Sequence, residues 1–173
     1  MNANLDRLFL DCSAGRLLQI ASRIETCLAS LDQRQAWMRG GENQNAVGNL
    51  VLHLCGNVRQ WIVSGVGGRP DIRDRDSEFA AREGLAPDEL ARRLHETVEE
   101  AAAVLSGVTA ERLAERVVIQ QYEISVLEAI YHVVEHFSMH AGQIIFATKM
   151  STGRDLGFYA HLNSAAAHGE RTP

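Results

Sequence analysis

The stretch Tyr131-His-Val-Val-Glu-His-Phe-Ser-Met-His-Ala-Gly-Gln143 carries three histidines at successive four-residue steps: His132, His136 and His140. On an α-helix, residues four apart lie one turn apart on the same face. Two such imidazoles can reach one metal ion, as the spaced histidines of known metal-binding helices do. The stretch therefore favours a long helix with a metal site on one face, completed by a ligand from another part of the chain.

His53 is the best candidate for that further ligand, because it lies in the apolar, helix-like stretch 44–64. We predict a metal site formed by His53, His136 and His140 inside an all-helical bundle. Neutral imidazole is a good ligand for zinc, nickel, iron or copper. Three protein ligands leave positions open for water or substrate, which is typical of a catalytic rather than a structural site. A purely structural histidine pair is the alternative reading of the same spacing.

The two predicted helices share one layout when their residues are plotted at roughly 100° per residue. Each has a wide apolar face and, along one edge of it, a polar strip that carries the histidines. Packing the apolar faces together brings the two strips to the rim of the core. Asn49, Asn57 and Gln143 lie on these strips and are candidates to bind a metal-bound water or a polar substrate. A solvated helix edge explains them equally well.

His132 lies one turn before His136 and is a further candidate ligand. Three ligands on one straight helix would span two turns, or about 11 Å. That span is too long for a single ion, so we expect His132 to lie beside the metal site or on the surface.

Four helices are predicted, covering residues 5–31, 44–64, 87–107 and 125–152. Their apolar residues recur at three- and four-residue steps. Ser125-Val-Leu-Glu128 has the pattern of a capping box, which is a helix start signal. We expect the charged stretch 71–84 to be a solvated loop that could rim the pocket. We expect 111–121 to be an extended connector, because Val117-Val118-Ile119 is too short to form a sheet by itself.

The composition is that of a soluble globular protein, with 173 residues, 46% hydrophobic residues and 23% charged residues. We predict one domain spanning residues 1–173. The net charge of −5 and the lack of a basic patch argue against nucleic acid as a partner. No apolar run is long enough to span a membrane, and the three cysteines form no disulfide framework. We therefore expect a cytoplasmic protein.

Three segments resemble the DinB/YfiT-like superfamily, which is distinct from the DNA polymerase that shares the DinB name. They are Gly48-Asn-Leu-Val-Leu-His53-Leu-Cys-Gly-Asn57, Arg73-Asp-Arg-Asp-Ser-Glu-Phe79 and His132-Val-Val-Glu-His136-Phe-Ser-Met-His140-Ala-Gly-Gln-Ile144. The resemblance implies a four-helix bundle with long crossover loops. It also implies that His53, His136 and His140 bind one divalent ion, often nickel or zinc, and that the protein forms a homodimer.

The resemblance also suggests a reaction. Characterised relatives include thiol-dependent transferases and isomerases that use bacillithiol, mycothiol or glutathione, although this sequence has no distinct thiol-binding signature. Our leading hypothesis is a metal-dependent S-transferase that joins a low-molecular-weight thiol to a small-molecule substrate. The alternatives are a metal-dependent hydrolase and a non-enzymatic, stress-associated dimeric bundle that binds metal. The catalytic residues beyond the metal ligands are not identified by the sequence.

Overall fold

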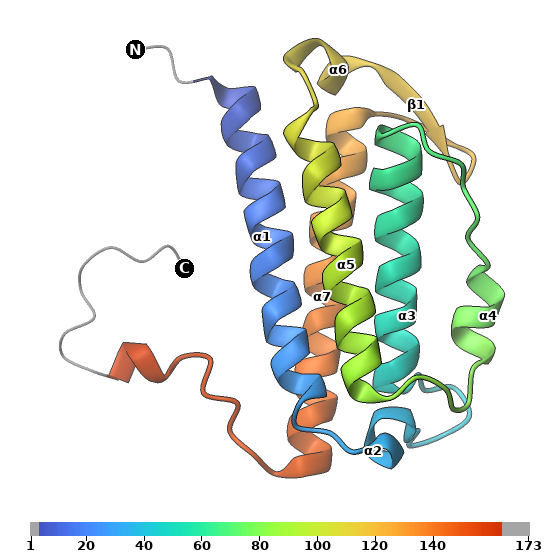
Figure 1. Cartoon of the computed structure of the whole chain (residues 1–173), viewed down its shortest axis with the longest axis vertical. Coiled ribbons are helices and arrows are strands. Elements are labelled where there is room, and N and C mark those ends of the chain that lie inside the picture. The colour runs from blue at the N-terminus through green and yellow to red at the C-terminus, as the bar shows by residue number, and fades with distance from the viewer. Residues whose placement is uncertain (1–3, 164–173) are drawn as a thin grey trace.

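Four long helices form the body of the molecule in the computed structural model, which describes residues 4–163 (Figure 1). Helix α1 packs against α5 and α7, and α3 packs against the same two helices from the other side of the bundle. The predicted all-α four-helix bundle is confirmed. The long helices are α1 (Leu5–Leu28), α3 (Val47–Val58), α5 (Pro87–Ser106) and α7 (Val126–Thr152).

The order of the helices requires a long crossover. Helices α3 and α5 run in the same direction, so the chain between them returns along the whole length of α3 (Figure 1). The end of α3 continues as a π-helical segment, Arg59–Val66, and the returning chain carries the short helix α4 (Arg75–Ala80). This crossover places α4 against α3, one of the two helices that carry the candidate ligands.

The core is built from the apolar faces that the periodicity predicts. Large side chains from all four helices are fully buried, among them Leu17, Leu54, Leu94 and Phe137. Burying each such side chain stabilises the fold by roughly 1.5–3 kcal/mol. The core therefore holds α3 and α7 in a fixed register, which the geometry of a shared site requires.

Local signals set the ends of α7 as expected. The Ser125 hydroxyl accepts from the backbone N–H of Glu128, and the Glu128 carboxylate accepts from the backbone N–H of Ser125. These reciprocal bonds satisfy donors that a helix start leaves free. Gly153 ends the helix at a φ of 65°, a left-handed conformation that glycine adopts without a steric penalty.

The connector 111–121 differs from the sequence-based expectation. It contains α6 (Ala110–Ala114) and strand β1 (Arg116–Ile119), which pairs antiparallel with β2 (Tyr122–Ser125). The prediction of an unpaired connector was wrong, because the partner strand follows immediately after a two-residue turn. The hairpin leads directly into α7, so its position is tied to the helix that carries His136 and His140.

The charged stretch 71–84 is also more ordered than a solvated loop. Within it, Asp74 begins α4 by accepting a hydrogen bond from the backbone N–H of Ser77. The side chain of Glu78 is buried although the surrounding charges are exposed. The remaining short elements of the described chain are α2 (Gln33–Trp37) and the 3₁₀ turn Ala160–Asn163.

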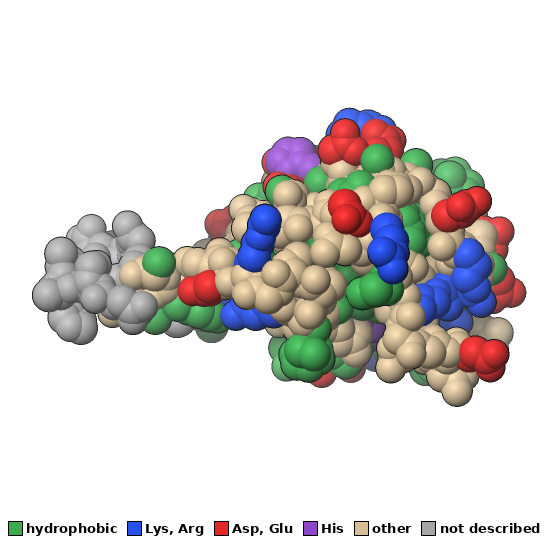
Figure 2. All heavy atoms as spheres, turned by 90° about the horizontal axis from the view of Figure 1, so that it is seen from below, with side chains coloured by type: hydrophobic (Ala, Val, Ile, Leu, Met, Phe, Trp, Pro, Cys, Tyr) green, Lys and Arg blue, Asp and Glu red, His purple; other side chains and the backbone are tan. Residues whose placement is uncertain are grey.

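Charged side chains of both signs lie on the face of the molecule at one end of the bundle. Seen from one end of the bundle, acidic and basic side chains are interspersed over the surface (Figure 2). No helix between residues 4 and 163 is long and apolar enough to cross a membrane. Cys27 and Cys55 are buried free thiols, and burial raises the pKa of Cys55 to about 11, so that thiol is inert near neutral pH.

Candidate metal centre

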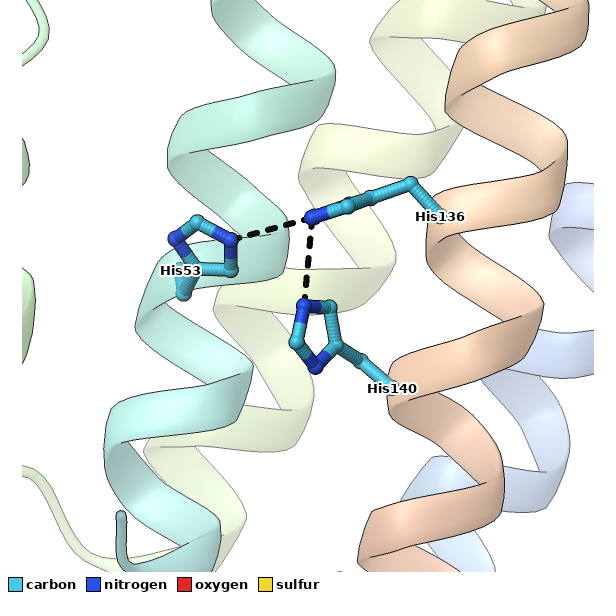
Figure 3. A group of neighbouring side chains, drawn as sticks. All are labelled: His53, His136 and His140. Atoms are coloured by element: carbon cyan, nitrogen blue, oxygen red, sulfur yellow. Dashed lines mark hydrogen bonds between the residues drawn. The ribbon is translucent and has the colours of Figure 1, made fainter. Parts of the chain in front are cut away.

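Three imidazoles meet between α3 and α7. His53 extends from α3, and His136 and His140 extend from consecutive turns of α7, with their rings directed toward one another (Figure 3). The Nε2 atom of His136 lies 3.2 Å from Nε2 of His53 and 3.1 Å from Nε2 of His140. One potential ligand atom from each residue lies within 4.8 Å of the others. The residues selected from the sequence are therefore brought together.

These distances suit a shared ion. Nitrogen ligands at about 2.0–2.1 Å from a tetrahedral ion lie roughly 3.3–3.4 Å from each other. The two short Nε2–Nε2 separations are close to that value, so a small adjustment would seat an ion. Three neutral nitrogens match zinc, nickel and related divalent metals.

A buried carboxylate orients His53. The Nδ1 atom of His53 lies 3.0 Å from a carboxylate oxygen of Glu78, and both side chains are more than nine-tenths buried. Ionised Glu78 can only accept, so Nδ1 carries the proton and donates it. The Nε2 atom of His53 then keeps its lone pair directed at the other two histidines, which is the tautomer that a metal ligand needs.

Arg73 holds the Glu78 carboxylate in its ionised form. Its guanidinium donates to both carboxylate oxygens, at 2.8 Å each. Burial alone would raise the pKa of Glu78, but the hydrogen bonds from Arg73 and His53 outweigh it and lower that pKa. The close approach of Arg73 Nη2 to His53 Nδ1 follows from sharing this carboxylate, because two donors cannot bond each other.

Gly56 makes room for the ion pair. A Cβ atom at this position would lie 1.9 Å from Oε1 of Glu78 and 2.9 Å from Nε of Arg73. Gly56 is three residues after His53, on the same side of α3. The absence of a side chain therefore allows α4 to approach the helix closely enough for Glu78 to reach His53.

Gln143 orients His140 in a similar way. Its side-chain oxygen lies 2.7 Å from Nδ1 of His140, so this nitrogen donates and Nε2 is left with its lone pair. The sequence suggested a substrate contact for Gln143. The structure places its oxygen behind a candidate ligand, where it fixes the orientation of the ring, and the substrate-binding role of Gln143 stays a prediction.

The central histidine is held neutral. Burial, followed by the neighbouring His140 and His53, lowers the pKa of His136 to about 3. Burial likewise lowers the pKa of His140, against an opposing effect of its bond to Gln143. The Nδ1 atom of His136 is buried and has no hydrogen-bond partner among the described residues. Both lowered pKa values favour the unprotonated imidazoles that bind metal ions.

The other predicted site residues fall in two places. Asn57 and His132 line a cavity beside the triad, and the His132 ring packs against Trp61 with a centroid distance of 4.2 Å and an angle of 40° between the ring planes. His132 thus lies next to the candidate metal centre and outside the three-histidine group, as expected. The substrate-binding role of Asn57 stays a prediction.

Asn49 lies outside that cavity and is fully bonded. Its Nδ2 atom donates to the carbonyl oxygens of Glu78 and Ala81, and its Oδ1 accepts from Arg39 and from the backbone N–H of Ala46. The side chain is completely buried. Asn49 therefore anchors the α4 segment to α3, and no polar group on it remains for a substrate.

The buried histidines give a pH dependence of stability. The pKa of His136 is about 3 in the fold and 6.5 ordinarily, so the unfolded chain binds a proton first as the pH falls. The free energy of unfolding of metal-free protein should therefore decrease as the pH is lowered from 6.5 toward 3. Urea denaturation at pH 7 and pH 5 measures this, and the His136→Gln variant should show a weaker dependence. An equal loss of stability in both proteins would contradict the assignment.

Fold and site together define a helical-bundle protein whose three clustered histidines can hold a metal ion. The chain belongs to the family described as "Protein of unknown function (DUF1572)", whose model matches residues 4–160. None of the curated proteins compared with the sequence matches it.

Solved structures with a similar fold include three proteins that differ widely in sequence from this chain. A conserved protein from Enterococcus faecalis is 15% identical with a TM-score of 0.72, over 83% of this chain and 97% of that one. A DinB-like protein from Bacillus subtilis, YjoA, is 16% identical with a TM-score of 0.65, over 85% of this chain and 96% of that one. A mycothiol-dependent maleylpyruvate isomerase is 14% identical with a TM-score of 0.61, over 78% of this chain and 60% of that one. These likenesses confirm the DinB-like fold expected from the sequence.

Proposed function

We propose that this protein is a divalent-metal-dependent S-transferase that uses a low-molecular-weight thiol. The observation that supports it is the convergence of three imidazole nitrogens beside an open cavity. Nickel and zinc are the proposed ions. A bound ion of this kind supplies a Lewis acid that lowers the pKa of a thiol and favours the nucleophilic thiolate.

The chain's own residues divide the remaining work. His53, His136 and His140 would hold the ion, and Glu78 and Gln143 would keep the outer two rings in the required tautomer. His53 and His136 line the cavity between the two helices and the hairpin, so a substrate in that cavity would lie beside the residues that would hold the ion. An S-transfer then forms a carbon–sulfur bond while the thiol proton and the leaving group depart.

A second cavity offers a place for the body of the thiol. It measures about 610 Å³ and is lined by the first turn of α3, by the last turns of α7 and by Gln143, whose side chain contacts His140. None of the described residues that line it carries a charge. Neutral amides there suit a ligand rich in hydroxyl and amide groups. Three of these amide side chains are consecutive in the sequence: Asn43, Gln44 and Asn45.

The mycothiol-dependent isomerase among the similar structures is a reason to include thiols in the test. Purified protein loaded with nickel or zinc would be assayed for conjugation of glutathione, bacillithiol and mycothiol to 1-chloro-2,4-dinitrobenzene and other electrophiles. We expect conjugation that is lost on chelation and restored by the ion.

The same assay separates the alternatives. Absence of conjugation with every thiol, in protein shown to be fully loaded, would refute the proposal. Metal-dependent release of nitrophenol from an ester without thiol would favour a hydrolase instead. A metal that only raises the melting temperature would favour a non-enzymatic metal-binding bundle.

A further inference from the structure

The cavity beside the triad has walls from four parts of the chain. It measures about 430 Å³ and lies between α3, α7, the α4 segment and the hairpin. His53 and His136 form the wall that faces the candidate metal centre. Trp61, Tyr122 and Ile124 supply aromatic and apolar surface. A flat organic molecule could therefore lie in the cavity with one end close to the triad.

The charges that face the cavity leave one cation uncompensated. Arg73 is neutralised by its two bonds to Glu78. The Glu128 carboxylate accepts from the start of α7 and lies 3.7 Å from Arg116. Arg75 forms no ion pair and no hydrogen bond with any described residue, and it lines the same cavity.

Stacking holds Arg75 near the triad. Its guanidinium carbon lies 4.9 Å from the centre of the Phe79 ring, one helical turn away. The Phe79 ring in turn lies 4.7 Å from the centre of the His53 ring. The guanidinium is therefore at most about 10 Å from His53, a span that a small substrate can bridge.

Two buried polar atoms in the cavity wall also lack partners. Oδ1 of Asn57 is an acceptor without a donor, and Nε1 of Trp61 is a donor without an acceptor, among residues 4–163. Both side chains are only 4% exposed. Buried polar groups are normally hydrogen-bonded, so a polar ligand that reaches these two atoms after a small movement of the wall would supply the missing partners.

The hairpin is held beside this cavity in an unfavourable conformation. Gln120 and Gln121 both have positive φ values, 51° and 69°, where glycine or asparagine is preferred. Such a conformation brings Cβ close to the following carbonyl oxygen and is unfavourable for a residue with a side chain. The Gln120 side chain lines the cavity and donates to Gln60, which also accepts from Arg73. The strained turn is thus linked through Gln60 to Arg73, which bonds the Glu78 carboxylate beside His53.

We propose that this cavity binds a substrate that carries a carboxylate, and that Arg75 is the residue that selects it. The planar guanidinium can accept a carboxylate in a two-point bond, and the apolar wall covers the body of the molecule. The inference rests on the proposed function, since it names the class of electrophile that would meet the thiol. The carboxylate end lies on Arg75, and the reactive end lies toward His53 and His136.

Calorimetric titration with benzoate and with benzamide tests the inference. The two molecules have the same flat shape, and only benzoate is charged. We expect the full-length protein to bind benzoate more tightly than benzamide. Arg75→Gln should lower the affinity for benzoate at least about 10-fold and leave the affinity for benzamide unchanged. Arg75→Lys keeps the positive charge and should retain part of the affinity for benzoate. Repeating the titration after chelation separates this binding from direct binding of the carboxylate to a metal.

Arg34→Gln is the matched control, because it removes one exposed arginine outside both cavities. It should bind benzoate as the unmodified protein does. The inference is overturned if the unmodified protein does not bind benzoate, if benzamide binds equally well, or if Arg75→Gln has no effect. Binding through Arg75 without any thiol conjugation would refute the S-transferase proposal alone. Conjugation without selectivity for the carboxylate would refute only the role of Arg75.

Discussion

Replacing His136 by alanine is expected to abolish tight binding of a divalent transition-metal ion, with an affinity at least about 100-fold lower. Losses of 10–100-fold are typical when only an outer partner of a ligand is removed. His136 is the central member of the triad, and its Nε2 atom lies within 3.2 Å of the corresponding atoms of both His53 and His140. Without it, His53 on α3 and His140 on α7 are the two candidate ligands that remain, and the nitrogen that lies close to both of them is lost.

The measurement is isothermal titration with zinc and nickel, together with the metal content of protein purified without added metal. His132→Ala is the matched control, because His132 lies on the same helix one turn away and is also partly buried. It should retain full metal content. Loss of the metal in His132→Ala, or unchanged affinity in His136→Ala, would show that the ligand set is a different one.

The three-histidine group could be predicted from the sequence because its placement depends on local helix geometry. Helix geometry alone places His136 and His140 on one face of their helix. His53 lies on a polar strip at the edge of the apolar face of its own helix, as the other two histidines do on theirs. Once the apolar faces pack, the strips must meet. The four long helices were predictable for the same reason, because amphipathic periodicity is a property of each segment by itself.

Contacts made by the crossover were not predictable in this way. Glu78 and Arg73 belong to a run of charged residues, and no local pattern distinguishes the buried pair from its exposed neighbours. The available signals were weak: a helix start at Asp74 and a glycine, Gly56, three residues after His53. Helical angles show which face Asn49 occupies, but they do not show which segment covers that face.

The hairpin was missed because its turn lacks the usual residues. Two-residue hairpin turns favour Asn-Gly or Asp-Gly, since both central residues need a positive φ. Gln120 and Gln121 adopt that conformation without either residue type. A turn that contradicts local preference is often found where surrounding structure supports a functional site, and here it borders the cavity beside the triad.

Glu78→Gln is expected to lower metal affinity about 10–100-fold while keeping the shape of the side chain. The glutamine amide has one accepting oxygen, so it cannot accept all three bonds that the two carboxylate oxygens accept from Arg73 and the Nδ1–H of His53. If its NH₂ group faces His53, Nδ1 must accept, and the proton moves to Nε2, where it blocks metal binding. The buried Arg73 also loses its counter-ion, which should reduce the free energy of unfolding by about 3 kcal/mol.

A purely structural role for Glu78 would lower stability alone, so affinity must be measured on folded protein. Competition with a fluorescent chelator at pH 7 and low temperature provides the affinity, near-ultraviolet circular dichroism verifies the fold, and thermal denaturation provides the stability. Glu100→Gln is the matched control, because Glu100 also accepts from two arginines, Arg59 and Arg69, outside the triad. It should change neither metal affinity nor metal content. A folded Glu78→Gln protein that binds zinc as tightly as the unmodified protein would show that His53 does not depend on this carboxylate for its orientation.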